Sequence, residues 1–248
     1  MLRMLTLFVV ICCISGCAVA GPSKEDMAKS HYHMGQSYMA TRDYSSALQE
    51  LREGVRLQPR NPDIHNLLAQ AYQHKAAFEQ AETHYLKALE LKPDDPYIQN
   101  NLAALYLDMQ RWDEAATYFR KAADNLVFRY PVRALTGLGL AYHRGGEYTQ
   151  AVMAYKEALK QFPDDLTVLR LLGQNYVKME KLSLAQQVFE RVLEIDPLDN
   201  VVRFEYAQTL LKQEENDRAR EEFREIANRE DQTSLGKEAR EYLKMLEE

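Results

Sequence analysis

The sequence predicts an all-α fold, a solenoid of six helix–turn–helix repeats followed by one C-terminal helix. Six segments align at the starts Ala28, Pro62, Pro96, Val132, Leu166 and Asn200, with spacings of 34, 34, 36, 34 and 34 residues. Small and large apolar residues recur at fixed positions of these segments, and proline with Asn or Asp recurs at most of their ends. Such a period is typical of stacked helix pairs, which favours a partner-binding surface over a catalytic pocket.

The composition excludes several other classes of protein. The 248 residues carry a formal net charge of −6, with 10 glycines and 8 prolines, so the chain is neither fibrous nor disordered. This mild acidity argues against nucleic acid as a partner, because nucleic-acid binding needs a basic stripe. Each repeat packs only on its neighbours, so the length predicts one continuous array rather than separate globular domains.

Residues 1–16 have the pattern of a targeting signal rather than of a folded element. Arg3 provides the positive start, and residues 5–14 form an apolar run that is short for a membrane span. The next segment, Ile14-Ser15-Gly16-Cys17, resembles the bacterial lipobox. The resemblance implies cleavage after Gly16 and acylation of Cys17, and an ordinary secretory signal is the alternative.

Residues 17–27 would then be the lipid anchor and a tether. Several acyl chains on Cys17 would hold the chain stably at a membrane, whereas a single chain binds only marginally. Ala18 follows the cysteine, and by resemblance to the sorting rules of Gram-negative-type bacteria it permits export to the periplasmic face of the outer membrane. Cys12 and Cys13 lie in the removed segment, so the mature fold would be held by packing rather than by disulfides.

Three positions define the packing expected inside each repeat. The eighth position is small, the twentieth is always alanine, and the twenty-fourth is large and apolar. The eighth-position residues are Gly35, Ala69, Ala103, Gly139, Gly173 and Ala207, and those at position 24 are Leu51, Tyr85, Phe119, Tyr155, Phe189 and Phe223. Small residues let two helix backbones approach, and a large side chain fills the space beside the contact.

This pattern resembles the tetratricopeptide repeat. The resemblance covers residues 28–229, divided as 28–61, 62–95, 96–131, 132–165, 166–199 and 200–229. It implies a right-handed superhelix in which the first helices of the repeats line a concave groove.

Most joints between repeats carry residues that stop one helix and start the next. Pro59, Pro93, Pro163 and Pro197 are expected to end the second helix of a repeat. Asn61, Asp95, Asp165 and Asp199 are expected to cap the next helix, so we interpret these acidic pairs as structural rather than catalytic.

One joint departs from this pattern. The stretch from Asp124 to Pro131 is two residues longer than the others and contains Leu126, Val127, Phe128 and Tyr130. We consider two interpretations, a longer packed turn and an apolar ledge that contacts a partner.

The C-terminal segment 234–248 predicts a final capping helix. Ser234 is the expected N-cap, and the apolar residues that follow fall on one stripe of a helix running from about Leu235 to Glu247. Such a helix would cover the open end of the last repeat.

By the same resemblance, positions 2, 5, 9, 12 and 13 of each repeat face the groove. The first half then presents amide, aromatic and apolar groups, from Tyr32, Gln36, Met39, Asn66, Gln70, Gln73, Tyr97, Asn100 and Leu107. The second half presents mostly basic groups, from Arg133, His143, Arg144, Arg170, Lys178, Phe204 and Lys212. A basic stretch in an acidic protein favours an acidic partner segment.

Chemistry-bearing motifs are otherwise sparse. The histidines show no metal-ligand spacing, and there is no phosphate-binding loop, nucleophile elbow or Cys–His pairing. We therefore expect no enzymatic activity, no cofactor, no metal site and no small-molecule substrate.

The combination of a lipobox, six repeats and this length resembles the PilW/PilF family of type IV pilus lipoproteins, the pilotins. The irregular joint, with Tyr130 and Pro131, is also similar to that family. The resemblance implies a protein that binds a secretin subunit and assists its localisation and assembly at the outer membrane. The alternative is a general envelope scaffold that recruits peptidoglycan enzymes or outer-membrane assembly factors.

Overall fold

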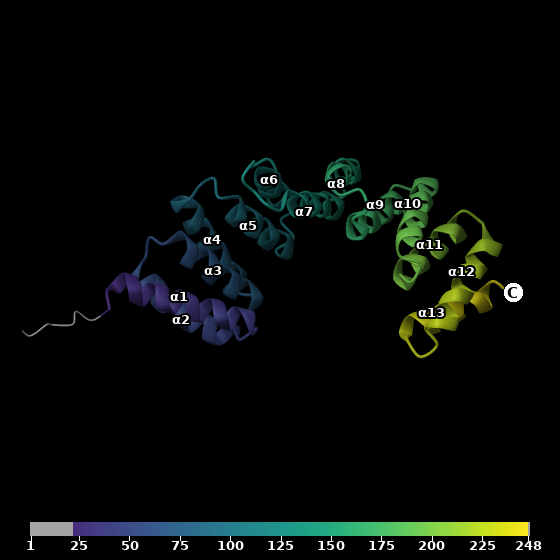
Figure 1. Cartoon of the computed structure of the whole chain (residues 1–248). Helices are drawn as coiled ribbons and strands as arrows, with labels where there is room; N and C mark the ends of the chain where they lie inside the picture. Colours follow the sequence, from purple (N-terminus) through teal and green to yellow (C-terminus); the bar gives the residue numbers. More distant parts are fainter. Residues whose placement is uncertain (1–21, 248) are drawn as a thin grey trace, which may run out of the picture.

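A computed structural model describes residues 22–247 of the chain and contains thirteen α-helices in that range. The first twelve form six helix–turn–helix pairs, which follow one another along an arch that ends in the last helix (Figure 1). The pairs are α1 (Lys24–Ala40) with α2 (Tyr44–Leu57), α3 (Pro62–His74) with α4 (Phe78–Leu91), α5 (Pro96–Asp108) with α6 (Trp112–Ala123), α7 (Pro131–Arg144) with α8 (Tyr148–Gln161), α9 (Leu166–Lys178) with α10 (Leu182–Ile195), and α11 (Asn200–Lys212) with α12 (Asn216–Arg229), before α13 (Ser234–Met245). The predicted all-α fold of six pairs and a final helix is confirmed.

The two ends of the array differ in detail from the prediction. Helix α1 begins at Lys24, inside the expected tether 17–27, because Ser23 and Asp26 cap each other's backbone N–H groups. Helix α13 is capped by Thr233 rather than Ser234, since the Thr233 hydroxyl accepts the N–H of Gly236 at 3.1 Å. The targeting segment 1–16 and Cys17 lie outside the described residues.

Inside each repeat the two helices meet through the expected small-on-large contact. A Cβ atom added to Gly139 would collide with the ring of Tyr155, and one added to Gly173 would collide with Phe189. Both aromatic rings are fully buried. The alanines at position 20 are also fully buried, so the closest approach of the helix pair is built from residues without bulk.

The joints between repeats carry the predicted helix caps, and some of them have a second hydrogen bond. The side chains of Asn61, Asp95, Asp165 and Asp199 each accept backbone N–H groups at the start of the next helix. In addition, at three of these joints the side chain at position 4 of the next repeat donates to the carbonyl of the preceding proline. This contact joins His65 to Pro59 at 3.0 Å, Gln99 to Pro93 at 2.9 Å and Arg203 to Pro197 at 2.8 Å.

The turn inside each repeat has a left-handed residue at position 15. Only the fourth repeat has glycine there, Gly146, and the other five turns use Arg42, Ala76, Gln110, Glu180 and Glu214. Each turn is closed by an N–H one residue later that donates to the carbonyl at position 11, as from Ala77 to Tyr72 at 3.0 Å. This is a Schellman-type ending, and its bonds offset the roughly 1 kcal/mol cost of a left-handed non-glycine residue.

A pair of histidines joins the two helices of the second repeat. His65 and His84 approach with their Nδ1 atoms 2.9 Å apart, and the His65 Nε2 lies 3.0 Å from the Pro59 carbonyl. A carbonyl only accepts, so His65 carries its proton on Nε2 and the His84 Nδ1 donates to the His65 Nδ1. Burial, together with the neighbouring His65, lowers the pKa of His84 from 6.5 to about 4. The folded protein therefore favours neutral His84.

This pair predicts a pH-dependent stability. An unfolded chain takes up a proton near pH 6.5, whereas folded His84 does so only near pH 4, so stability is complete above pH 6.5 and falls as the pH drops towards 4. His84→Gln retains an N–H donor without a titrating group. We expect it to remove on the order of 1 kcal/mol of the pH-dependent loss, allowing for partial exposure.

Urea unfolding at pH 7.5 and pH 4.5 measures this loss, with exposed His33→Gln as the matched control. An equal loss in the His84→Gln, His33→Gln and unsubstituted proteins would contradict the assignment.

Candidate functional site

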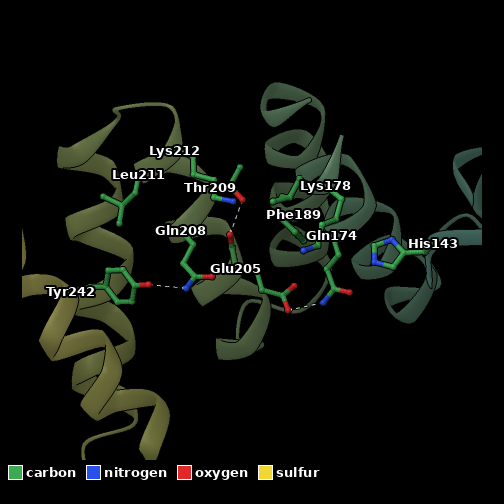
Figure 2. A pocket seen from close by; sticks show the side chains of 11 residues that line it. His143, Gln174, Lys178, Phe189, Glu205, Gln208, Thr209, Leu211, Lys212 and Tyr242 are labelled. Carbon is green, nitrogen blue, oxygen red and sulfur yellow. Dashed lines mark hydrogen bonds between the residues drawn. The ribbon is translucent and has the colours of Figure 1, made fainter. Parts of the chain in front are cut away.

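A concavity with a volume of about 510 Å³ lies on the C-terminal half of the solenoid. The close-up in Figure 2 shows its lining, contributed by the helices α7, α9, α10, α11 and α13. We call this surface the C-terminal groove, lined by His143, Gln174, Val177, Lys178, Phe189, Glu205, Gln208, Thr209, Leu211, Lys212 and Tyr242. Positions 9, 12 and 13 of the fifth and sixth repeats all contribute, as the sequence predicts.

Hydrogen bonds between successive helices fix the polar part of the groove. The Gln174 amide donates to Glu205 at 2.8 Å, and the Gln208 amide donates to the Tyr242 hydroxyl at 3.1 Å (Figure 2). Arg170 also holds Glu205 through its guanidinium, with a shortest distance of 2.6 Å. Glu205 is therefore neutralised locally, and the groove keeps little negative character.

His143 is held at the edge of the groove by a buried amide. The Asn175 side chain is fully buried, donates to the Tyr148 carbonyl at 2.9 Å and accepts from the His143 Nδ1 at 2.8 Å. This arrangement places the His143 proton on Nδ1. An adjoining depression is lined by His143, Arg144 and Trp112, so the groove continues towards the fourth repeat.

Two predicted groove residues differ from the expectation. Arg170, predicted to contribute to a basic groove, is paired with Glu205 of the next repeat, an interaction that raises its pKa, and it lines a depression together with Gln174. Asn100, predicted to face a partner, is buried at 4% exposure.

Phe204, a further predicted groove residue, is also covered. It packs edge-on against Tyr242 of the capping helix, with the ring centroids 5.6 Å apart. Only 7% of its surface is exposed. The capping helix therefore removes one apolar side chain from the groove and contributes the Tyr242 hydroxyl in its place.

The predicted residues of the first half lie on the first helices of their repeats. Gln36 is exposed and donates to the hydroxyl of half-buried Tyr32 at 3.1 Å. Asn66 is half-buried and accepts from Asn101 of the next repeat at 3.1 Å, and Gln70 is half-buried nearby on the same helix. Inter-repeat hydrogen bonds thus occupy part of this surface.

In the second half, Arg133, Arg144 and Lys178 are exposed and form no ion pair within residues 22–247. Lys178 lines the C-terminal groove and Arg144 lines the adjoining depression. These three residues therefore give the second half of the solenoid the predicted basic character, even though the charge of Arg170 is paired.

The irregular joint combines a packed residue with an exposed tip. Phe128 is buried at 6% exposure and meets the ring of Tyr97 edge-on, at 5.1 Å between centroids. Leu126 and Val127 are 102% and 74% exposed, and Tyr130 is 56% exposed. The packed-turn interpretation therefore describes Phe128, whereas Leu126 and Val127 are presented to solvent, and contact of this tip with a partner stays a prediction.

Sequence reasoning missed several residues that shape the groove. Glu205 sits at position 6, Thr209 at position 10 and Phe189 on a second helix, none of which the repeat pattern assigns to the groove. Tyr242 belongs to the capping helix, whose docking angle is not encoded in the period. For Glu205, the sequence offered one signal, an arginine and a glutamate 35 residues apart that could pair between successive repeats.

The site contains no arrangement suited to metal chemistry. Among residues 22–247, no group of three or more His, Cys, Asp or Glu side chains is placed to hold a metal ion. Over the same range, none of the helices combines the length and the apolar character that a membrane crossing needs.

An array of helix pairs with an open groove that presents lysine side chains defines a helical-repeat scaffold. Models described as tetratricopeptide repeat match residues 32–96, 94–164, 130–197 and 178–243. The chain therefore belongs to the tetratricopeptide-repeat family, whose members bind protein partners and typically have no enzymatic activity. Protein CTR9 homolog of Arabidopsis thaliana is 38% identical over 71 residues, which is 28% of this chain and 6% of that protein.

Several solved structures share the fold. The structure of PilW, described as a widely conserved type IV pilus biogenesis factor, has a TM-score of 0.75 at 19% identity and covers 85% of this chain and 96% of its own. Pseudomonas aeruginosa PilF has a TM-score of 0.70 at 17% identity, covering 87% and 97%. MamA of Desulfovibrio magneticus RS-1 has a TM-score of 0.63 at 21% identity, covering 71% and 99%. At these identities the similarity establishes the fold alone.

Two substitutions in the irregular joint are expected to change the free energy of unfolding by different amounts. Phe128→Ala removes a buried ring and is expected to lower the free energy of unfolding by about 3 kcal/mol. Leu126→Ser changes a side chain without packing contacts and is expected to stay within about 0.5 kcal/mol of the unsubstituted protein. Chemical denaturation measures both, and equal destabilisation by the two changes would show that the loop packs differently.

Proposed function

We propose that the chain is a lipid-anchored periplasmic adaptor that assists a type IV pilus secretin to reach the outer membrane and form multimers. The observation that carries the proposal is a combination, a lipobox-like segment ending at Cys17 joined by a short linker to a solenoid with an open groove. The acyl chains would supply the membrane address, and the groove would supply the contact with the secretin subunit.

The similarity of the fold to pilus proteins supports this assignment. The solved structures of PilF and PilW each match more than four-fifths of this chain. The charge of the groove and of the adjoining depression is also suited to the role. Arg144, Lys178 and Lys212 form no ion pair with another described residue, so they can attract an acidic segment of a partner.

The exposed tip of the irregular joint offers a second contact surface. Leu126 and Val127 protrude beside Tyr130 and expose apolar area that the fold does not use. Exposed apolar residues gathered in one place are typical of interaction sites. We assign this tip to a contact with the same partner outside the groove.

Gene deletion tests the role in the producing organism. Secretin multimers that resist denaturing gel electrophoresis should decrease sharply in the deletion strain and return when the unsubstituted gene is restored. The Cys17→Ser chain, which cannot be acylated, should be found in the soluble periplasmic fraction and should restore multimers only partly.

Normal secretin multimers in the deletion strain would refute the pilotin role and favour the general envelope scaffold instead. Fractionation of the Cys17→Ser chain with the outer membrane would separately refute the anchor.

A further inference from the structure

One position of the repeat changes its charge halfway along the solenoid. The thirteenth residue, at the end of each first helix, is Ala40, His74 and Asp108 in the first three repeats and Arg144, Lys178 and Lys212 in the last three. His74 stacks on Tyr44, and Asp108 accepts a hydrogen bond from Gln73. The three cations of the second half are exposed and form no ion pair within the described range. They form a row of free positive charge.

Helix stability alone does not account for this row. A cation in the last turn interacts favourably with the helix dipole, by roughly 0.3–1 kcal/mol. Helices α1 and α5, however, have no basic residue in their last turn. Among the first helices of the six described repeats, a Lys or Arg stands in the last turn only in α7, α9 and α11. These three helices line the groove or the depression beside it, which points to an anionic ligand.

The last two repeats also carry the same short motif. Residues 174–178 and 208–212 both read Gln-x-x-apolar-Lys, with Val177 and Leu211 as the apolar members. All six named positions of the two motifs line the groove. Two consecutive helices therefore present an amide, an apolar side chain and an ammonium group in the same order.

The two glutamines are oriented to accept hydrogen bonds. The Gln174 amide nitrogen donates to Glu205, and the Gln208 amide nitrogen donates to Tyr242. Neither amide oxygen accepts a hydrogen bond from another described residue. Each glutamine thus offers a fixed acceptor, which suits the backbone N–H of a bound peptide.

We propose that the C-terminal groove binds an extended peptide with an acidic residue at every third position, each carboxylate meeting one cation of the row. This inference rests on the proposed adaptor function and specifies the chemistry of its partner segment.

The spacing of the helices supports this period. Helix α7 contacts α9, and α9 contacts α11, and helices in contact have axes about 8–10 Å apart. In a polyproline II conformation, three residues advance about 9.3 Å and return the side chain to the same face. Acidic residues at positions i, i+3 and i+6 would therefore meet Arg144, Lys178 and Lys212 in turn.

Other conformations match the groove less well. Side chains on one face of a β-strand repeat every two residues, or about 6.8 Å, which falls short of the helix spacing. An α-helix satisfies its own backbone N–H groups over most of its length, so it would leave the Gln174 and Gln208 oxygens without donors. The observations favour an extended segment.

Peptides of equal composition test the period. Three fluorescent peptides, carrying three glutamates at every third, at every second, or at adjacent positions, are titrated into the chain bearing Cys17→Ser, so that no acyl group contributes. Loss of two exposed ion pairs corresponds to about a tenfold change in affinity. We expect the every-third peptide to bind about tenfold tighter than the other two by fluorescence anisotropy. Equal affinities would overturn the proposal.

Substitutions test the row itself. Lys178→Gln with Lys212→Gln should weaken binding of the every-third peptide about tenfold. The matched control, Lys156→Gln with Lys160→Gln, removes the same charge from exposed positions on α8 and should change affinity less than twofold. Thermal melts of both variants establish that they are folded. Equal weakening by the two pairs would refute site-specific recognition.

The fluorescence of Trp112, the one tryptophan in the chain, reports on the depression shared with Arg144 and should change only with the every-third peptide. An unchanged Trp112 signal at saturation would exclude Arg144 from the row.

The two proposals fail in different ways, because the peptides contain no secretin sequence. If the groove binds the every-third peptide selectively but the deletion strain has normal secretin multimers, only the pilotin role is refuted. If the multimers are lost but no peptide binds selectively, only this inference is refuted.

Discussion

The structure depends on one contact that recurs in every repeat, a small residue of the first helix against a large side chain of the second. Where this contact is Gly139 on Tyr155 or Gly173 on Phe189, no room exists for even one added carbon atom. Because the helix backbones lie this close, the pair behaves as one rigid unit. At the four regular joints the proline and Asx residues then set how one unit follows the next, so the positions of most groove residues derive from these two features.

The same repeated frame supports two different surfaces. In the first half, inter-repeat hydrogen bonds such as Asn101 to Asn66 use side chains that a partner would need. In the second half, the pairing of Arg170 with Glu205 neutralises the one carboxylate that lines the groove, and the terminal lysines of α9 and α11 form no ion pair with another residue that the structure describes. The irregular joint separates these halves. An array of nearly identical units thus acquires a preferred end for binding.

The period and the packing positions predicted the fold because they act locally, within one helix pair or one joint. Predictions failed where side chains of different repeats interact. Arg170 fitted a groove position, but a glutamate one repeat later pairs with it. Asn100 and Phe204 occupy groove positions too, yet neighbouring helices bury them. The 34-residue period indicates which positions of a repeat face the groove. Whether a side chain at such a position stays accessible depends on how the next helix packs. Phe204, for example, is covered by Tyr242 of the capping helix.

We expect a partner to bind in the C-terminal groove. Site-specific photo-crosslinking in cells tests this binding. A photoreactive amino acid at Gln208, which lines the groove, is compared with one at Gln187, an exposed residue of α10 outside the lining. We expect an adduct with the secretin subunit from position 208 and none from position 187. An adduct from position 187 without one from position 208 would contradict it.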